Sequence, residues 1–292
     1  MSVVGQARRV RAQVAGSPTL RKAAGKLLTR MPVGGARGNA SAWTLPAGSL
    51  EPLAERYADF ELSPISYGTA RDLSDSIDHL PGLAGANMDM KDMQRCWTVK
   101  AILGNVPRGT RLVEIGAGEP LVAGVLSRLG YDVTVVDPYM GSGNGPREYE
   151  TFRSAYPDVH FIREEFPPAD AIEAGVGAVY SISVLEHVPL EQIDGVIGAA
   201  RELLAPGGGA SIHAVDHVVA GWGADAHREK LERIVAAMGL SNDELDHAIA
   251  RLEGDPEAYF VSAEVHNRWR GDIPYDDYPM RRIGSVNLFA ST

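Results

Sequence analysis

The sequence predicts an α/β protein with a doubly wound, mostly parallel sheet. From Arg111 onward, short apolar runs alternate with stretches of helical periodicity. The apolar runs are nearly continuous, which is typical of strands that are buried on both faces beneath helices. A glycine turn follows the first run, at the strand end where sheets of this kind bind their ligands.

The composition is that of a globular chain. The 292 residues are 45% hydrophobic and 23% charged, which is enough to bury a full core. One cysteine, Cys96, excludes an internal disulfide and favours a cytoplasmic location. No apolar run approaches the ~18 residues that span a bilayer, and the N-terminus lacks the apolar region of a secretory signal.

Residues 1–50 form a basic leader that differs from the rest of the chain. They hold eight basic residues and no acid, whereas residues 51–292 hold 20 basic and 38 acidic residues. A helix start at Ser17-Pro18 and apolar residues on one face predict a short amphipathic helix. We expect a leader that is partly disordered or docks as a helix, with peripheral membrane contact as the alternative. The acidic body argues against a nucleic-acid partner.

Residues 51–104 are expected to form a helical cap, including a helix over 88–103. Residues 105–292 are expected to form the ligand-binding domain, with a segment at about 217–283 covering the substrate. Its predicted strands are 111–115, 132–137, 159–162, 178–182, 209–215 and 284–290. Its predicted helices are 120–129, 145–155, 190–204, 225–240 and 241–252, the last beginning with a capping box of Ser241 and Glu244.

The turn after the first strand predicts a pocket for an adenosine-type ligand. Gly116 and Gly118 allow a tight turn and a close approach of the backbone to a ligand. Asp137 follows Gly118 by 19 residues, at the end of the second strand, where its carboxylate can accept both hydroxyls of a ribose. Two acids around the turn, Glu114 and Glu119, favour a ligand with a cationic end and disfavour a pyrophosphate. The alternative is that Glu119 only stabilises the start of the following helix.

Four segments carry a resemblance to a known family: "VEIGAGEP" (113–120), "VTVVDP" (133–138), "AVYSISVLEHVP" (178–189) and "ARELLAPGGGASIHAV" (200–215). Together, over roughly residues 95–218, they resemble the class I S-adenosylmethionine-dependent methyltransferases. The resemblance implies a seven-stranded Rossmann-like sheet and S-adenosylmethionine as the cofactor. It implies cofactor contacts from Gly116, Ala117, Gly118 and Asp137, and from an acid near the adenine, Glu164 or Glu165. Glu114 and Ser183 are further candidates for cofactor contacts. Pro120 stands where the family usually has a third glycine.

The tips of the fourth and fifth predicted strands provide the catalytic candidates. Asp216 and His217 are the stronger pair and His187 is the third candidate, for deprotonating a hydroxyl group. Asp216, His217 and Glu186 also have the ligand types of a divalent metal site, and Mg²⁺ is the expected ion. The alternatives are that His187 packs against the fold and that Asp216 and His217 cap the segment that follows.

A carbohydrate acceptor is predicted from residues that combine aromatic faces with hydrogen-bonding groups. These residues are Trp222, His266, Asn267, Arg268, Trp269 and Tyr275. A surface loop that is bonded to itself would have the same composition. We therefore expect an S-adenosylmethionine-dependent methyltransferase that acts on a hydroxyl of a small, sugar-like acceptor. The alternatives are an N- or C-methyltransferase of a natural-product or quinone-like acceptor, a nicotinamide-dependent oxidoreductase, or a nucleotide-binding module.

Overall fold

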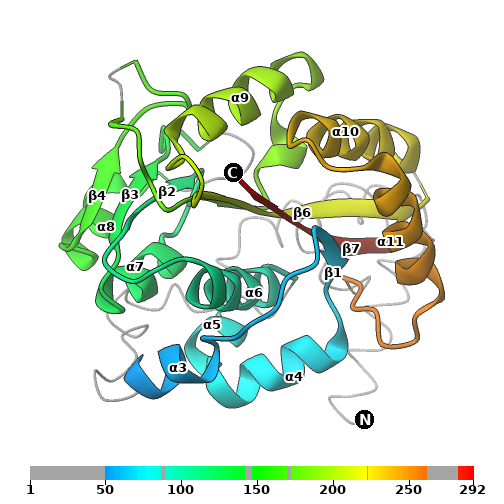
Figure 1. Cartoon of the computed structure of the whole chain (residues 1–292), viewed down its shortest axis with the longest axis horizontal. Helices are drawn as coiled ribbons and strands as arrows, with labels where there is room; N and C mark the ends of the chain where they lie inside the picture. The colour runs from blue at the N-terminus through cyan, green and yellow to red at the C-terminus, as the bar shows by residue number, and fades with distance from the viewer. Residues whose placement is uncertain (1–49, 87–89, 142–146, 170–171, 222, 262–281) are drawn as a thin grey trace, which may run out of the picture.

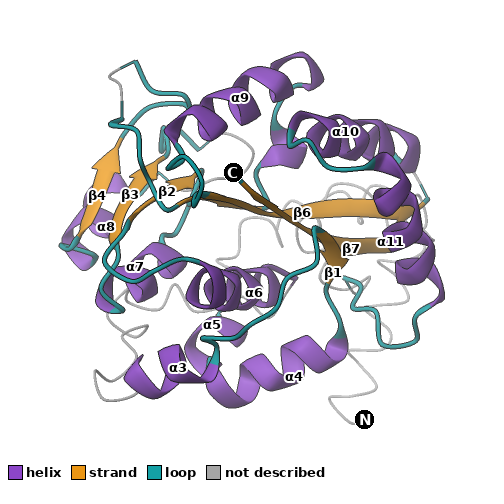
Figure 2. Cartoon of the chain, viewed as in Figure 1, coloured by secondary structure: helices purple, strands orange, loops and turns teal. Residues whose placement is uncertain are grey.

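A computed structural model of the chain describes residues 50–86, 90–141, 147–169, 172–221, 223–261 and 282–292. Within these residues, one seven-stranded sheet lies between two layers of helices (Figures 1 and 2). The strands in their spatial order are β1 (Ile65–Tyr67), β7 (Arg282–Ser291), β6 (Ala210–Ala220), β5 (Ala178–Ile182), β2 (Arg111–Ile115), β3 (Asp132–Val136) and β4 (Val159–Ile162).

The order of the strands reverses next to β2. From β2 the chain proceeds to β3 and β4 on one side, and it then returns to β5 and β6 on the other side. These five strands are parallel, whereas β7 runs antiparallel to both of its neighbours, β6 and β1. The predicted doubly wound, mostly parallel fold is therefore confirmed. The carboxyl ends of β2, β3, β5 and β6 meet at the crevice where such sheets bind ligands.

The two helical layers pack on opposite faces of the sheet through side chains that alternate along each strand. α6 (Met90–Asn105) and α7 (Leu121–Arg128) cover the face that carries Leu112, Tyr180 and Ile212. The other face carries Val215 and Leu288. It is covered by α9 (Ile193–Leu203), α10 (Ala224–Ala237) and α11 (Asn242–Gly254). α8 (Tyr149–Ala155) packs near the edge strand β4, where Tyr149 contacts the ring of Phe161.

Most of the expected strands lie where the sequence predicts them, and β6 is the main difference. The strand expected over 209–215 continues to Ala220, because β6 pairs with β7 from Ala210 opposite Ser291 to Ala220 opposite Arg282. The helix expected over 190–204 begins as the short 3₁₀ turn η5 (Leu190–Gln192) before α9. α11 begins at the predicted cap, where the Ser241 hydroxyl accepts a hydrogen bond from the Glu244 N–H at 3.4 Å.

The segment expected to form a helical cap contains, among its described residues, four helices and one short strand. It comprises α3 (Leu50–Arg56), β1, α4 (Ala70–His79), α5 (Pro81–Ala84) and α6. β1 is an edge strand of the sheet, and it escaped prediction because it has only three residues. In α6, 13 of the 16 residues are buried. A helix that is buried almost all round belongs to a core, so α6 packs into the body of the protein.

The basic leader, apart from its last residue Leu50, lies outside the described residues, and so do residues 222 and 262–281 of the segment expected to cover the substrate. Among the helices that the structure describes, none combines the length and the apolar character needed to cross a bilayer.

Candidate active site at the strand ends

The glycine turn lies at the end of β2, against the end of β5. Gly116 and Gly118 have φ angles of +65° and +58°, in the left-handed region that favours glycine. A β-carbon on Gly116 would lie 2.9 Å from Cγ2 of Val184. The turn can therefore take this path only with glycine at position 116.

Asp137 is hydrogen-bonded to this turn. Its Oδ2 accepts the N–H of Gly118 at 2.9 Å, and its Oδ1 accepts the N–H of Tyr139 at 2.7 Å. These bonds fix the carboxylate at the mouth of the turn. Each carboxylate oxygen has a second lone pair, so both oxygens can still accept a hydroxyl group of a ligand.

Two further acids lie around the turn. Glu114 is buried in β2 and accepts a hydrogen bond from the Tyr180 hydroxyl at 3.0 Å. Burial raises the pKa of Glu114 to about 7, although the Tyr180 hydroxyl and the nearby Arg95 guanidinium act in the opposite direction. Glu119 is half-buried just before α7, and burial raises its pKa as well, against the pull of Arg95.

The two candidate acids after β4 differ in their surroundings. Glu164 is half-buried and its Oε2 accepts the N–H of Ala169 at 2.7 Å, whereas Glu165 is exposed. Glu164 therefore lies closer to the body of the protein, with one oxygen bonded within its own loop.

Just beyond the end of β5, beside the middle of β6, three polar side chains contact one another. The Ser183 hydroxyl lies 2.7 Å from Oε1 of Gln94 and 2.8 Å from Oδ1 of Asp216. Nε2 of Gln94 donates to the same Asp216 oxygen at 2.9 Å. Asp216 is thus placed at the crevice on the face of the sheet that α6 covers.

The structure does not bring His217 to the Asp216 side chain. Successive residues of a strand point to opposite faces of a sheet, and β6 continues through both positions. His217 is buried on the side of α10, where burial, and then the neighbouring His227 and Arg228, lower its pKa to about 4. Its ring is therefore neutral at physiological pH and faces away from the crevice.

Glu186 and His187 lie in the 3₁₀ turn η4 (Leu185–His187) after β5. Glu186 is only 7% exposed, and neither of its carboxyl oxygens has a hydrogen-bond partner in the described part of the chain. Burial, and then the charge of Asp216, raise the pKa of Glu186 well above the usual value. The backbone N–H groups of Glu186 and Asp216 and the charge of Lys91 act in the opposite direction. The His187 side chain is 57% exposed, with Nε2 4.0 Å from Oε1 of Glu186.

The expected Mg²⁺ ligands are therefore only partly assembled. Glu186 and Asp216 are neighbours, but His217 points to the other face of the sheet. Among the described residues, no three side chains of His, Cys, Asp or Glu lie close enough to hold a metal ion. The residues expected to contact a sugar, Trp222, His266, Asn267, Arg268, Trp269 and Tyr275, lie outside the described residues.

Comparison with known proteins adds distant likenesses. No family model and no curated protein matches the sequence. The solved structures that resemble it include a TehB-like SAM-dependent methyltransferase from Corynebacterium glutamicum, which is 14% identical with a TM-score of 0.40. This match covers 75% of this chain and 98% of that one. Geranyl diphosphate C-methyltransferase from Streptomyces coelicolor is 15% identical, with a TM-score of 0.46, over 83% of this chain and 97% of that one.

A third similar structure is phosphoethanolamine N-methyltransferase 2 from Haemonchus contortus, which is 18% identical with a TM-score of 0.41. The match covers 67% of this chain and about half, 52%, of that one. The seven-stranded sheet, its glycine turn and the acid at the end of β3 are those expected from the motifs. The chain has a class I methyltransferase fold. Likenesses this distant carry no argument about its activity or acceptor.

Three residues at the candidate site, Gln94, Arg95 and Tyr139, were not predicted from the sequence. Gln94 and Arg95 lie on α6, and nothing in the sequence distinguishes them from the other polar residues of this helix, such as Lys91 and Lys100. Arg95 is buried beside Asp92, with Nη1 3.5 Å from Oδ1 of that residue. Tyr139 has φ +49°, and its backbone N–H donates to Asp137. A backbone contact of this kind cannot be predicted from the pattern of side chains in the sequence.

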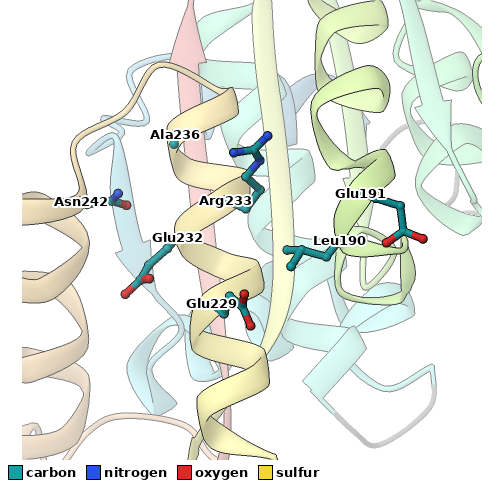
Figure 3. Close-up of a pocket in the computed structure, with 7 residues that line it drawn as sticks. All are labelled: Leu190, Glu191, Glu229, Glu232, Arg233, Ala236 and Asn242. Atoms are coloured by element: carbon teal, nitrogen blue, oxygen red, sulfur yellow. The ribbon is translucent and has the colours of Figure 1, made fainter.

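A hollow of about 560 Å³ on the methyltransferase fold lies apart from the strand ends. η5, α10 and the start of α11 form it (Figure 3). Its lining is Leu190, Glu191, Glu229, Glu232, Arg233, Ala236 and Asn242, and it shares no residue with the site described above. We therefore define the candidate site by the side-chain contacts at the strand ends and not by this hollow.

Proposed function

We propose that the chain is an S-adenosylmethionine-dependent methyltransferase that methylates a hydroxyl group of a small acceptor. The observation that carries this proposal is the hydrogen bond from the Gly118 N–H to Asp137. It joins the glycine turn of β2 to a carboxylate at the end of β3, in the crevice beside the reversal of strand order. A ribose with two free hydroxyls is the natural partner of such a carboxylate.

The residues around the turn fit this cofactor. Asp137 would accept the ribose hydroxyls, and the backbone at Gly116, Ala117 and Gly118 would lie against the methionine part. Glu114 and Glu119 supply a negative environment for its cationic groups. When bound, S-adenosylmethionine supplies a methyl group on a positively charged sulfur.

A nicotinamide cofactor fits the same turn less well. The pyrophosphate of a dinucleotide binds at the N-terminus of the helix after the first strand. Here Glu119 and Pro120 occupy that position just before α7, and Glu119 is half-buried. A carboxylate beside two phosphates would repel them, so we place the oxidoreductase second.

The chemistry of the acceptor follows from Asp216. An acceptor hydroxyl must lose its proton as its oxygen forms the new O–C bond and the C–S bond breaks, leaving the electron pair on sulfur. Asp216 lies at the crevice with Oδ1 hydrogen-bonded to two side chains, and its carboxylate can take that proton. A sugar-like acceptor and a cytoplasmic location remain proposals that rest on the sequence.

Calorimetric titration tests the cofactor. We expect S-adenosylhomocysteine to bind and NAD to give no signal. We expect Asp137→Ala to weaken the binding of S-adenosylhomocysteine by about 30-fold or more, because a buried charged partner is lost. Asp132→Ala is the matched control, since Asp132 lies at the opposite end of β3 and should leave affinity unchanged. Binding of NAD, or full affinity in Asp137→Ala, would contradict the proposed function.

A screen of hydroxylated acceptors with a labelled methyl donor tests the reaction. Asp216→Asn should lower kcat about 100-fold or more, which is typical of losing a general base, and should leave S-adenosylhomocysteine affinity unchanged. Methylation of amines alone would move the assignment to an N-methyltransferase. Methylation of phenols but of no sugar would remove the carbohydrate proposal, and an unimpaired Asp216→Asn would remove Asp216 as the base.

A further inference from the structure

Gln94 is a buried polar residue that the proposed chemistry does not yet use. It lies on α6 and its side chain is fully buried. Burying an amide costs free energy unless its donor and acceptor are both satisfied. The Gln94 amide nitrogen donates to Oδ1 of Asp216 on β6, and its oxygen lies 2.7 Å from the hydroxyl of Ser183, just after β5. The single hydrogen of that hydroxyl is shared between the Gln94 oxygen and Oδ1 of Asp216.

The contacts of Asp216 are unequal at its two oxygens. Oδ1 is 2.9 Å from the Gln94 amide nitrogen and 2.8 Å from the Ser183 hydroxyl. No hydrogen bond to Oδ2 is found in the described part of the chain, and the residue is partly exposed. Oδ1 is therefore the carboxylate oxygen that these two side chains hold.

Ser183 adopts a backbone conformation that serine seldom takes. Its φ is +52°, a value that costs free energy outside glycine and persists only where the surroundings determine it. Its N–H donates to the carbonyl of Ala214 at 2.9 Å, which ties the strained residue to β6. The conformation places the hydroxyl within reach of both Gln94 and Asp216.

We infer that Gln94 and Ser183 are positioning residues that hold Oδ1 of Asp216 and so direct Oδ2 at the acceptor hydroxyl. The inference rests on the proposed function, because it acts through the proton transfer assigned to Asp216. A carboxylate at a strand end is otherwise free to rotate about its last torsion, which has a broad preference. Misplacement of a reacting group by about 1 Å can cost about 100-fold in rate.

Gln94→Leu tests the inference, because leucine keeps the bulk of the side chain and removes both hydrogen bonds. We expect kcat to fall 10- to 100-fold, with the acceptor KM and the affinity for S-adenosylhomocysteine within about 2-fold of wild type. Thr98→Val is the matched control. Thr98 is buried one turn further along α6, and its hydroxyl donates to the backbone carbonyl of Gln94 and not to its side-chain amide, so kcat should not change.

A double-mutant cycle separates positioning from a general loss of structure. If Gln94 acts only through Asp216, then adding Gln94→Leu to Asp216→Asn should lower kcat no further. Losses that multiply in the double variant, or an equal loss in Thr98→Val, would overturn the inference. Should Gln94→Leu fail to fold, Ser183→Ala removes one of the same bonds from β5 and should give the same split between kcat and KM.

A crystal structure of Gln94→Leu gives a readout that does not depend on turnover. We expect the Asp216 carboxylate to rotate or to occupy two orientations. A carboxylate that keeps its wild-type orientation in the variant would refute the positioning role and leave the proposed function intact. Absence of S-adenosylhomocysteine binding in the wild-type protein would instead refute the proposed function.

Discussion

His213 lies in the middle of the sheet with both ring nitrogens in contact with serine hydroxyls. Nδ1 is 2.7 Å from the Ser181 hydroxyl and Nε2 is 2.8 Å from the Ser211 hydroxyl. A neutral imidazole offers one donor and one acceptor, so this arrangement satisfies the neutral ring. Burial lowers the pKa of His213 to about 3. The residue is therefore structural, although it lies on a strand that carries the candidate site.

The pKa of His213 leads to a prediction about stability. In the unfolded chain histidine binds a proton below about pH 6.5, whereas folded His213 stays neutral down to about pH 3. Unfolding is therefore increasingly favoured as the pH falls from 6.5 toward 3. Between pH 7 and pH 5 this one group should lower the free energy of unfolding by about 2 kcal/mol.

Urea unfolding of wild type and His213→Gln at both pH values measures this contribution. Glutamine keeps a donor and an acceptor but does not titrate, so the difference between pH 7 and pH 5 should shrink by about 2 kcal/mol in the variant. An unchanged pH dependence would show that His213 is protonated in the folded protein.

At the scale of elements, α6 connects the candidate site to the N-terminal helices. Gln94 lies toward one end of α6, and Lys100 lies further along it. Nζ of Lys100 is 2.6 Å from Oδ2 of Asp75 on α4 and 5.2 Å from the ring centre of Tyr57. Tyr57 donates its hydroxyl to the same oxygen of Asp75 at 2.8 Å. Burial would raise the pKa of Asp75, but these partners together with Arg56 lower it to about 2.

Lys100→Met should destabilise the protein, because methionine keeps most of the stem and leaves Asp75 without its closest cation. Breaking a buried pair costs about 3–5 kcal/mol. Asp75 is about one-third exposed, so solvent screening reduces the expected loss to about 1–2 kcal/mol at pH 7. An acid with a lowered pKa stabilises the fold above about pH 4 and loses this contribution as the pH falls toward 2. The difference between wild type and variant should disappear over that window.

Chemical denaturation at pH 7 and pH 3 measures this effect. Arg71→Met is the control, because Arg71 pairs with Glu257 at the surface, where its side chain is 78% exposed, and should change stability little. If Lys100→Met and Arg71→Met are equally stable, the pair with Asp75 does not stabilise the N-terminal segment.

At the scale of the whole molecule, sequence reasoning recovered the features that depend on local spacing. The strands from Arg111 to Ile182 are short and apolar, and the position of Asp137 at the end of β3 follows from one strand–turn–helix–strand unit. β1 has three residues, too few to show a period. The contact between Gln94 and Asp216 joins residues 122 positions apart, which no local pattern encodes.

Asp216 and His217 were expected to act as a pair, but their side chains lie on opposite faces of the sheet. The strand was expected to end at residue 215, which would leave the next two side chains free to point the same way. β6 instead continues to Ala220, since β7 supplies partners along its whole length. Alternation along the strand then separates the two side chains. The extent of a strand is set by its neighbour, and that neighbour is more than 60 residues away in the sequence.

The place of β7 between β6 and β1 has a consequence for how the protein is made. β1 is synthesised more than 200 residues before β7, the strand it pairs with. Until the ribosome has released residues 282–291, both β1 and the β7-facing edge of β6 lack their partner. A nascent chain therefore carries unpaired strand edges through most of translation, a state in which chains are prone to aggregate or to recruit chaperones.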